Sequence, residues 1–247
     1  MARCELTHVP RVAIDLTVAR HQHEAYERTL SALGCRVERI EADDDRPDSV
    51  FVEDAAVVFD ELAIVLRPGA ESRRAEIPGV ARALAPHRPL HWIAAPGTVD
   101  GGDVLAVARR VFVGRSARTN AAGVEQLWRI LAPFGYSVEA VDISGCLHLK
   151  SAVTAAGDHT LLINREWIDA SRFSDFSLID TDPSEPFAAN VLRIGDALVC
   201  AEAFPRTNDR LRAHGLRVRT VAAGELAKAE GGLTCCSLIL EPGARMS

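Results

Sequence analysis

The chain has 247 residues, which is long enough for one large domain or two small ones with a substantial hydrophobic core. Apolar residues make up 48% of it and charged residues 25%, a balance typical of an ordinary globular protein. The net charge of −6 and the lack of a basic stripe argue against a nucleic-acid-binding protein. No apolar run is long enough to span a membrane, and the start "MARCELTHVP" lacks a signal-peptide core, so we expect a cytoplasmic protein that does not bind membranes.

A unit of strand, helix and strand recurs along the chain. Residues 17–42 supply a helix, a glycine and a strand, and residues 62–93 and 111–143 each run from a short apolar strand through an amphipathic helix to a second strand. Residues 160–180 form a shorter copy, and residues 197–221 form a full one. Where a glycine precedes the final strand, it suits the C-terminus of a helix. No linker divides these copies, so we expect a single domain over residues 1–247.

A second element, a loop running into an apolar strand, lies between the copies. It reads "VFVEDAAVV", "VDGGDVLAV", "LHLKSAVTA", "FAANVLRI" and "LTCCSLIL" in chain order. If five such units were arranged around an axis, they would bury faces that none could bury alone, and equivalent strand starts would converge at the centre. The alternative is an α/β sheet with five unrelated strand beginnings. One polar residue in each loop recurs at spacings of 46, 48, 42 and 45 residues: Asp54, Asp100, His148, Asn190 and Cys235.

Together, these side chains could perform nucleophilic catalysis. Cys235 would become a nucleophile if His148, as imidazolium, favoured its thiolate, and neutral His148 could activate water. Asp100 could orient the imidazole, and Glu53 with Asp54 could bind a planar guanidinium group. Each residue also has an ordinary interpretation: a buried cysteine, a core histidine, a tight turn at "DGGD" and solvated charges at "VED".

Six motifs resemble those of a known enzyme family. "PDSVFVED", "RPGAESRR", "APGTVDGGD", "SARTN", "LHLKS" and "GGLTC" are similar, in order from about Glu5 to Leu240, to motifs of the dimethylarginine dimethylaminohydrolases, members of the guanidino-group-modifying superfamily. The resemblance implies an α/β fold, a five-bladed pseudosymmetric propeller (pentein) of ββαβ modules. It also implies hydrolysis of Nω-methylated arginine to citrulline and an amine, without a metal or an organic cofactor.

The resemblance assigns a role to each candidate catalytic residue. Cys235 attacks the guanidinium carbon, and His148 protonates the departing amine. A covalent S-alkylthiouronium intermediate forms, which water activated by His148 hydrolyses. Asp100 supports the histidine. Because neighbouring side chains in a strand point to opposite faces, we expect Cys236 to pack away from Cys235. The repeat spacing tolerates either cysteine, and the family match selects Cys235.

The resemblance also assigns substrate-binding roles. Glu53 and Asp54 match the pair that binds the guanidinium group, and Asp48 matches an acid that holds the amino-acid end. Arg73 and Arg118 match the arginines that bind the substrate carboxylate.

Near its two ends, the chain matches two backbone contacts of the family with the substrate and differs from the family pattern in two ways. Leu6 and Ala229 match positions whose backbone touches the substrate. "CELTH" looks like the segment that covers the substrate, yet it follows Met1 by only two residues. This leaves open a misassigned start or a missing first strand. Glu230 stands where relatives often have aspartate.

Other functions stay open at this stage. An arginine deiminase or an amidinotransferase would use the same groups on another guanidino compound, although the chain lacks the extra helical domain of arginine deiminases. A non-catalytic propeller that serves as a binding module would not need the Cys, His and acid set. Adjacent cysteines rarely form a good disulfide or supply two ligands to one metal, which disfavours a redox or zinc role. The sequence leaves the oligomeric state open, a homodimer included.

Overall fold

The computed structural model describes residues 1, 3–41 and 45–241. The chain forms two compact units: unit 1 comprises Met1–Arg39 and Asp142–Thr234, and unit 2 comprises Ile40–Val141 and Cys235–Ser247. The prediction of a single domain over the whole chain stays a prediction. No helix among the described residues is long and apolar enough to cross a membrane.

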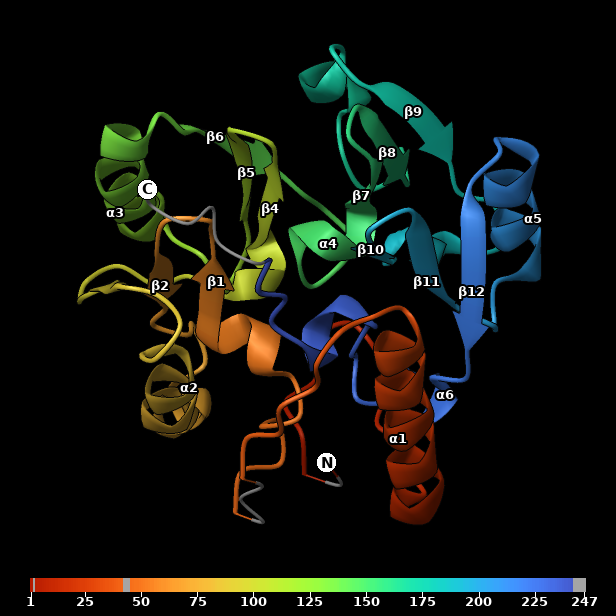
Figure 1. Ribbon diagram of the computed structural model, residues 1–247, viewed down its shortest axis with the longest axis horizontal. Coiled ribbons are helices and arrows are strands. Elements are labelled where there is room, and N and C mark those ends of the chain that lie inside the picture. The colour runs from red at the N-terminus through yellow and green to blue at the C-terminus, as the bar shows by residue number, and fades with distance from the viewer. Residues whose placement is uncertain (2, 42–44, 242–247) are drawn as a thin grey trace. The chain divides into compact units, whose positions relative to one another are not determined.

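In the part of the chain that the structure describes, four three-stranded sheets repeat one topology (Figure 1). In three of them the first two strands are antiparallel and the third is parallel to the second; in the remaining sheet, β4 and β5 are antiparallel and β6 lies next to β5. A parallel neighbour requires a crossover connection, so we expect a helical segment between the second and third strands. The sheets are β1 (Ala56–Val58), β2 (Ala63–Val65) and β3 (Leu90–Trp92); β4 (Val104–Val107), β5 (Arg110–Arg115) and β6 (Ser137–Asp142); β7 (Val153–Gly157), β8 (Thr160–Ile163) and β9 (Ser177–Asp180); and β10 (Leu192–Ile194), β11 (Ala197–Ala201) and β12 (Arg217–Val221).

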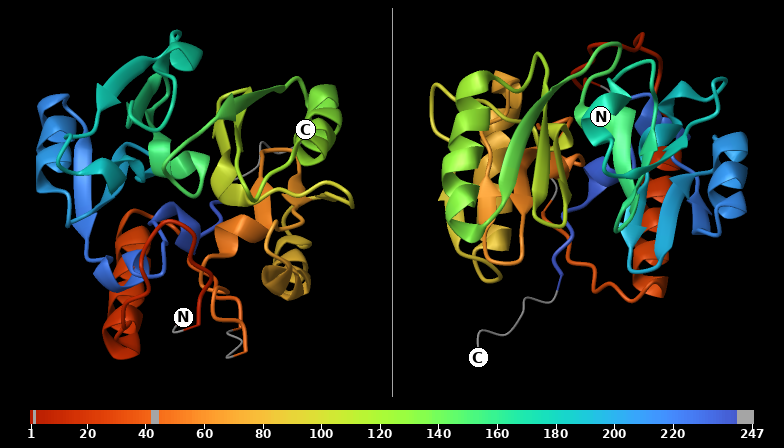
Figure 2. Two further views of the ribbon diagram at one scale, coloured as in Figure 1. Left: turned by 180° about the vertical axis from the view of Figure 1, so that it is seen from behind. Right: turned by 90° about the horizontal axis from the view of Figure 1, so that it is seen from above.

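The crossovers are the helices that the sequence predicts, with one difference. They are α2 (Ile77–Leu84), α3 (Ala121–Leu131), the 3₁₀ helix η5 (Ala170–Phe173) and α5 (Pro205–Ala213). In unit 1, α5 packs against β12, as two views show (Figures 1 and 2). The ββαβ order is therefore confirmed, and only the third crossover shrinks to a single 3₁₀ turn.

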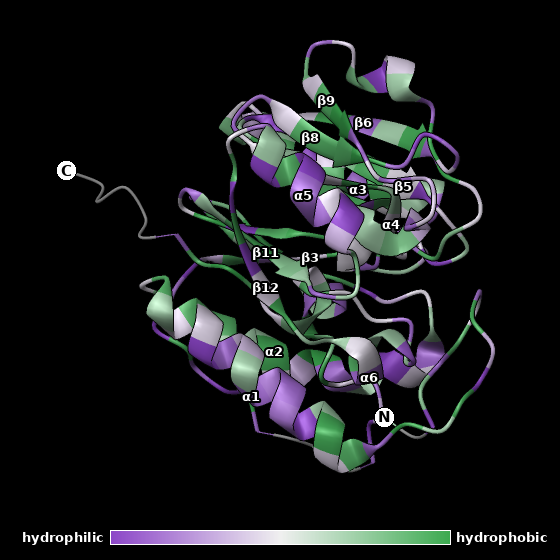
Figure 3. Cartoon of the chain, turned by 90° about the vertical axis from the view of Figure 1, so that its right-hand side faces the viewer, coloured by the Kyte–Doolittle hydropathy of each residue, from purple (hydrophilic) through white to green (hydrophobic). Residues whose placement is uncertain are grey.

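Local signals explain where several helices begin and end. Helix α1 (Leu16–Ala32) begins after Asp15, whose carboxylate accepts hydrogen bonds from the next turn, and it lies beside α6 (Gly224–Ala227) in unit 1 (Figure 3). Gly34, Gly135 and Gly215 follow helical segments with φ of 95°, 78° and 80°. The predicted role of glycine at these helix ends is confirmed, because only glycine adopts this left-handed conformation without cost.

The repeated polar residues lie in or directly beside short helical turns rather than at strand starts. A single turn precedes the first strand of each sheet, and a further turn carries the cysteine pair. The five turns are η1 (Val52–Ala55), η3 (Gly101–Asp103), α4 (Leu149–Ala152), η6 (Pro186–Ala189) and η7 (Thr234–Cys236). The prediction that these residues begin strands is therefore wrong in detail. Asp54 and Cys235 lie within such turns, Asp100 and His148 directly precede them, and Asn190 directly follows one.

The repeat that contains α1 differs from the other four. Residues 35–41 and 237–240, which we predicted as strands, have no strand assignment. Their apolar side chains Ile40, Leu238 and Leu240 still pack against a buried cluster in unit 2 that includes Val65 and Leu84. These segments contribute to the core through side chains, without a pairing ladder. The remaining 3₁₀ helices, η2 (Glu71–Glu76) and η4 (Ala132–Phe134), flank α2 and α3 in the chain.

Candidate active site

The η1 turn holds Glu53 and Asp54 in the interior of unit 2, where both are buried. Gly101 packs against this turn so closely that a Cβ atom there would lie 1.9 Å from the carbonyl oxygen of Glu53. The next residue, Gly102, donates its N–H to Oδ1 of Asp54 at 3.0 Å. The glycines of "DGGD" therefore allow η3 to approach η1, and one of them fixes a predicted guanidinium-binding carboxylate.

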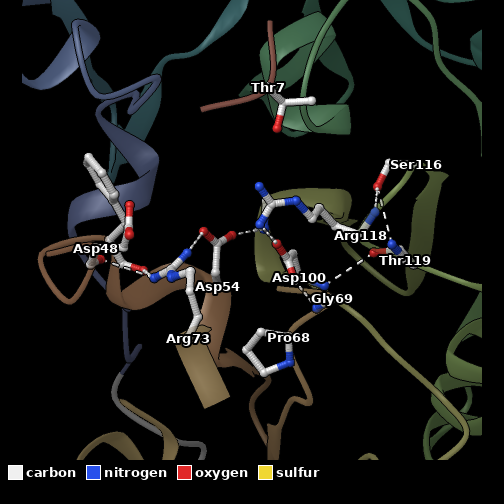
Figure 4. Close-up of polar contacts among 12 residues, drawn as sticks. Thr7, Asp48, Asp54, Pro68, Gly69, Arg73, Asp100, Ser116, Arg118 and Thr119 are labelled. Carbon is white, nitrogen blue, oxygen red and sulfur yellow. Dashed lines mark hydrogen bonds and ion pairs between the residues drawn. The ribbon is translucent and has the colours of Figure 1, made fainter. Parts of the chain in front are cut away.

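Arg73 anchors the other side of Asp54 (Figure 4). Its Nη1 pairs with Asp54, while its Nε and Nη2 donate to the two carboxylate oxygens of Glu76 at 3.2 and 2.8 Å. Nη2 also donates to the backbone carbonyls of Phe51, at 2.8 Å, and Asp48, at 3.1 Å. Arg73 thus joins η1, the loop before it and η2. Its predicted contact with a substrate carboxylate stays a prediction.

The charges around Arg73 compensate one another. Burial acts to lower the pKa of Arg73, but the carboxylates of Asp54, Glu76 and Asp100 outweigh it and raise that pKa. Burial raises the pKa of Glu76, although the ion pair with Arg73 opposes this change. Sequence reasoning missed Glu76, because one glutamate in a polar stretch gives no sign that it is buried.

Asp100 and Arg118 meet in the same unit. Asp100 is fully buried, its Oδ1 accepts the N–H of Gly69 at 2.8 Å, and its Oδ2 lies 3.9 Å from Nη1 of Arg118. A Cβ atom at Gly69 would lie 2.5 Å from the Cα of Arg118, so only glycine permits this approach. The structure thus brings together Asp100, which we predict to support the histidine, and Arg118, which we predict to bind the substrate carboxylate.

Cys235 and Cys236 are both buried and lie on η7. A 3₁₀ helix has three residues per turn, so consecutive side chains point roughly 120° apart. The predicted strand is wrong, but the two thiols still face different directions. Burial, together with the nearby charge of Glu53, raises the pKa of Cys236 to about 12. Cys236 is therefore a neutral thiol at physiological pH.

In unit 1, His148 immediately precedes α4 and is buried. Its carbonyl oxygen accepts the N–H of Ser151 at 3.0 Å and the Sγ–H of Cys146 at 3.4 Å. These two bonds hold the backbone of the loop that carries the imidazole.

Asn190 connects that region to the segment before the cysteines. Its Oδ1 accepts the N–H of Thr234 at 3.1 Å, and its Nδ2 donates to Oγ1 of Thr234 at 3.1 Å and to the carbonyl of Lys150 at 3.2 Å. Gly232 lies against the same amide, where a Cβ atom would approach to 2.4 Å. The repeat spacing identified Asn190 as an equivalent position, but only the structure shows this bracing role.

Leu6 is half-buried and belongs to a segment that Glu230 holds within unit 1. The carboxylate of Glu230 accepts the N–H groups of Thr7 and His8 at 2.7 and 2.9 Å. Glu230 itself has a φ of 60°, an uncommon value for a residue other than glycine, and it follows the buried Ala229. The two predicted backbone-contact positions are therefore joined through Glu230.

Comparison with known proteins gives close relatives over almost the whole chain, although no family model matches it. The N(G),N(G)-dimethylarginine dimethylaminohydrolase of Streptomyces coelicolor is 45% identical over 237 residues, which cover 95% of this chain and 91% of that protein.

Two solved structures are similar as well. One is a cysteine-to-serine variant of the Pseudomonas aeruginosa dimethylarginine dimethylaminohydrolase with citrulline, with a TM-score of 0.91, 35% identity, and coverage of 94% of this chain and 92% of that one. The other, a histidine-to-glycine variant of a dimethylarginine dimethylaminohydrolase as an adduct with S-methyl-L-thiocitrulline, has a TM-score of 0.90, 35% identity and the same coverage. The predicted α/β fold of ββαβ modules is confirmed.

Proposed function

This chain belongs to the dimethylarginine dimethylaminohydrolase family, and we propose that it hydrolyses Nω-methylated L-arginines to L-citrulline and a methylated amine. Identity of 45% over nearly the full length of both proteins carries this proposal. The citrulline bound to a relative of the same fold supports it, because citrulline is the product that this reaction would release. The substrate would be a small guanidino compound.

The carboxylates of η1 would bind the guanidinium group. Glu53 and Asp54 are buried, and Asp54 is held on one side by Arg73 and on the other by the N–H of Gly102. A carboxylate fixed in this way can accept paired hydrogen bonds from a planar guanidinium without first losing conformational freedom. The positive charge of the bound substrate would in turn favour a thiolate nearby.

The amino-acid end of the substrate would be recognised by other residues. Asp48 would hold the α-amino group, and Arg118, with Arg73, the α-carboxylate. Backbone groups of Leu6 and Ala229 would complete this contact. Arg118 is the better supported of the two arginines, because all three guanidinium nitrogens of Arg73 already donate to groups of the protein itself.

The chemistry would proceed in two displacements at one carbon. The thiolate of Cys235 adds to the guanidinium carbon, His148 gives a proton to the methylated nitrogen, and the C–N bond breaks to release the amine. His148 then accepts a proton from water as that water adds to the S-alkylthiouronium carbon. Breaking the C–S bond of this adduct returns the thiolate, and loss to solvent of the proton on the added oxygen leaves L-citrulline. Asp100 would stabilise the protonated form of His148.

One assay tests the proposal. The purified protein is incubated separately with asymmetric dimethylarginine, monomethylarginine and arginine, and citrulline, methylated amines and ammonia are measured. We expect citrulline with dimethylamine or methylamine from the first two substrates, and little product from arginine. A folded protein that turned over neither methylated substrate would refute the proposal, and ammonia from arginine alone would identify a deiminase instead.

A further inference from the structure

We propose that Asp103 is a positioning residue that fixes both Asp100 and Arg118 through the hydroxyl groups of Ser116 and Thr119. This inference rests on the proposed function, because it explains how two of the assigned residues keep their places. Asp103 is the second acid of "DGGD" and has no assigned role. It is fully buried in unit 2.

The first observation is a pair of short hydrogen bonds to one carboxylate oxygen. Ser116 Oγ and Thr119 Oγ1 both donate to Oδ2 of Asp103, at 2.6 and 2.7 Å. Such distances are typical of hydroxyl donors to an ionised carboxylate. An ionised carboxylate can only accept hydrogen bonds, so each hydroxyl must donate its single proton to Asp103. The lone pairs of both hydroxyls are thereby left to accept from other donors.

Ser116 uses its lone pairs to shape the loop that carries Arg118. Its Oγ accepts the N–H of Arg118 at 3.0 Å and the N–H of Thr119 at 3.2 Å, a turn of the kind that serine hydroxyls commonly form (Figure 4). With one proton donated and two accepted, this hydroxyl is saturated. The backbone at Arg118 is therefore fixed through Ser116 by the charge of Asp103.

Thr119 connects the same carboxylate to Asp100. Its Oγ1 accepts the N–H of Asp100 at 3.2 Å, and the N–H of Asp103 donates to the carbonyl oxygen of Asp100 at 3.0 Å. The backbone N–H and the carbonyl oxygen of Asp100 are thus both hydrogen-bonded, and the N–H of Gly69 holds its carboxylate. One buried charge orients two hydroxyls, and these orient one group for the histidine and one for the substrate.

The two branches predict different kinetic losses. Ser116→Ala should leave the Arg118 and Thr119 N–H groups without that acceptor, and should raise KM for monomethylarginine about tenfold with little change in kcat. Thr119→Val should disturb Asp100 and lower kcat about tenfold with little change in KM. Thr119→Ser keeps the hydroxyl and should restore most of kcat.

Thr207→Val provides a control. Thr207 is also buried, and its Oγ1 accepts the N–H of Asp182 at 3.0 Å, so this variant likewise leaves a backbone N–H without its hydroxyl acceptor. We expect it to lower the melting temperature as Thr119→Val does while leaving both kinetic constants close to wild type. Equal kinetic losses in the two valine variants would overturn the inference, as would wild-type kinetics in both Ser116→Ala and Thr119→Val.

Amide hydrogen exchange provides a readout that does not depend on activity. In the wild-type protein the amides of Asp100, Arg118 and Thr119 should be protected. Ser116→Ala should speed exchange at Arg118 and Thr119, and Thr119→Val should speed it at Asp100. Unchanged exchange refutes the inference even if the wild-type enzyme is active. Faster exchange in a protein that turns over no methylarginine refutes only the proposed function.

Discussion

At the scale of single residues, Cys236 is a thiol that resists ionisation. With a pKa of about 12, only about one Cys236 side chain in 100,000 would be a thiolate at pH 7. A thiol in that state is a poor nucleophile. We therefore expect Cys235→Ser to abolish citrulline formation and Cys236→Ala to retain most of it, measured with monomethylarginine at pH 7.

Alkylation of the same proteins adds a second measurement. Iodoacetamide at pH 7 should modify Cys235 and leave Cys236 unmodified, as located by peptide mass spectrometry. If Cys236→Ala abolished activity while Cys235→Ser retained it, the assignment of the nucleophile would be wrong.

The residues around Asp54 show what sequence reasoning reaches at this scale. The motifs identify Asp54 and Arg73, because both belong to characteristic short stretches. They do not identify Glu76, whose buried carboxylate pairs with Arg73 within η2, nor the bond from Gly102 to Asp54. The sequence allows Gly101 to be interpreted as part of a tight turn, but the structure shows that a side chain there would clash with the backbone of Glu53. Tertiary contacts of this kind leave no periodic signal in the sequence.

At the scale of elements, Asn190 braces the chain before the nucleophile. Asn190→Ala removes its bonds to Thr234 and Lys150, and leaves a buried N–H without that acceptor. We expect it to reduce the free energy of unfolding by about 1–3 kcal/mol and to lower kcat with monomethylarginine, because η7 would lose its support. Urea unfolding and steady-state kinetics measure the two effects.

Asn164→Ala is the control for this prediction. Asn164 is buried in the same unit, donates to the carbonyl of Pro186 at 2.9 Å and accepts the N–H of Glu166 at 2.9 Å, and these bonds do not involve the segment before the cysteines. It should lose similar stability with a smaller loss of kcat. If both variants lost kcat equally, Asn190 would have only a general structural role.

The order of elements was largely predictable, since each repeat has a strong apolar strand, an amphipathic helix and often a glycine between them. The predictions failed where a segment is too short to show its period. The third crossover contains only the short helix η5, and the loops with the polar residues form single turns that resemble strand beginnings in sequence. Residues 35–41 and 237–240 have apolar side chains that suit a strand, but these pack against the core, partly buried, without one.

At the scale of the whole molecule, buried weak acids in both units predict a loss of stability in alkali. Burial raises the pKa of Cys200, in unit 1, and of Cys236, in unit 2, to about 12. Burial, with a hydrogen bond to Glu61, raises the pKa of Tyr136 in unit 2 to about 12 as well. In the unfolded chain, thiols ionise near pH 9 and phenols near pH 10.

Between those values and pH 12, the unfolded chain would release protons that the folded chain retains. The unfolded state then binds fewer protons, so the free energy of unfolding should fall as pH rises, beginning near pH 9. Tyr136→Phe should remove the part of this fall that starts near pH 10, because phenylalanine carries no ionisable proton. At pH 8 the same variant should be less stable than wild type by about 1.5–3 kcal/mol, because it lacks the hydrogen bond to Glu61.

Urea unfolding at pH 8, 9, 10 and 10.5 measures both effects. The curves of wild type and Tyr136→Phe should converge as pH rises above 10, whereas Cys200→Ala should differ from wild type in slope already between pH 9 and 10. A constant gap between wild type and Tyr136→Phe across this range would show that the phenol ionises alike in the folded and unfolded chain. The contact of Tyr136 with Glu61 would then stabilise the protein only through geometry, without linking its stability to pH.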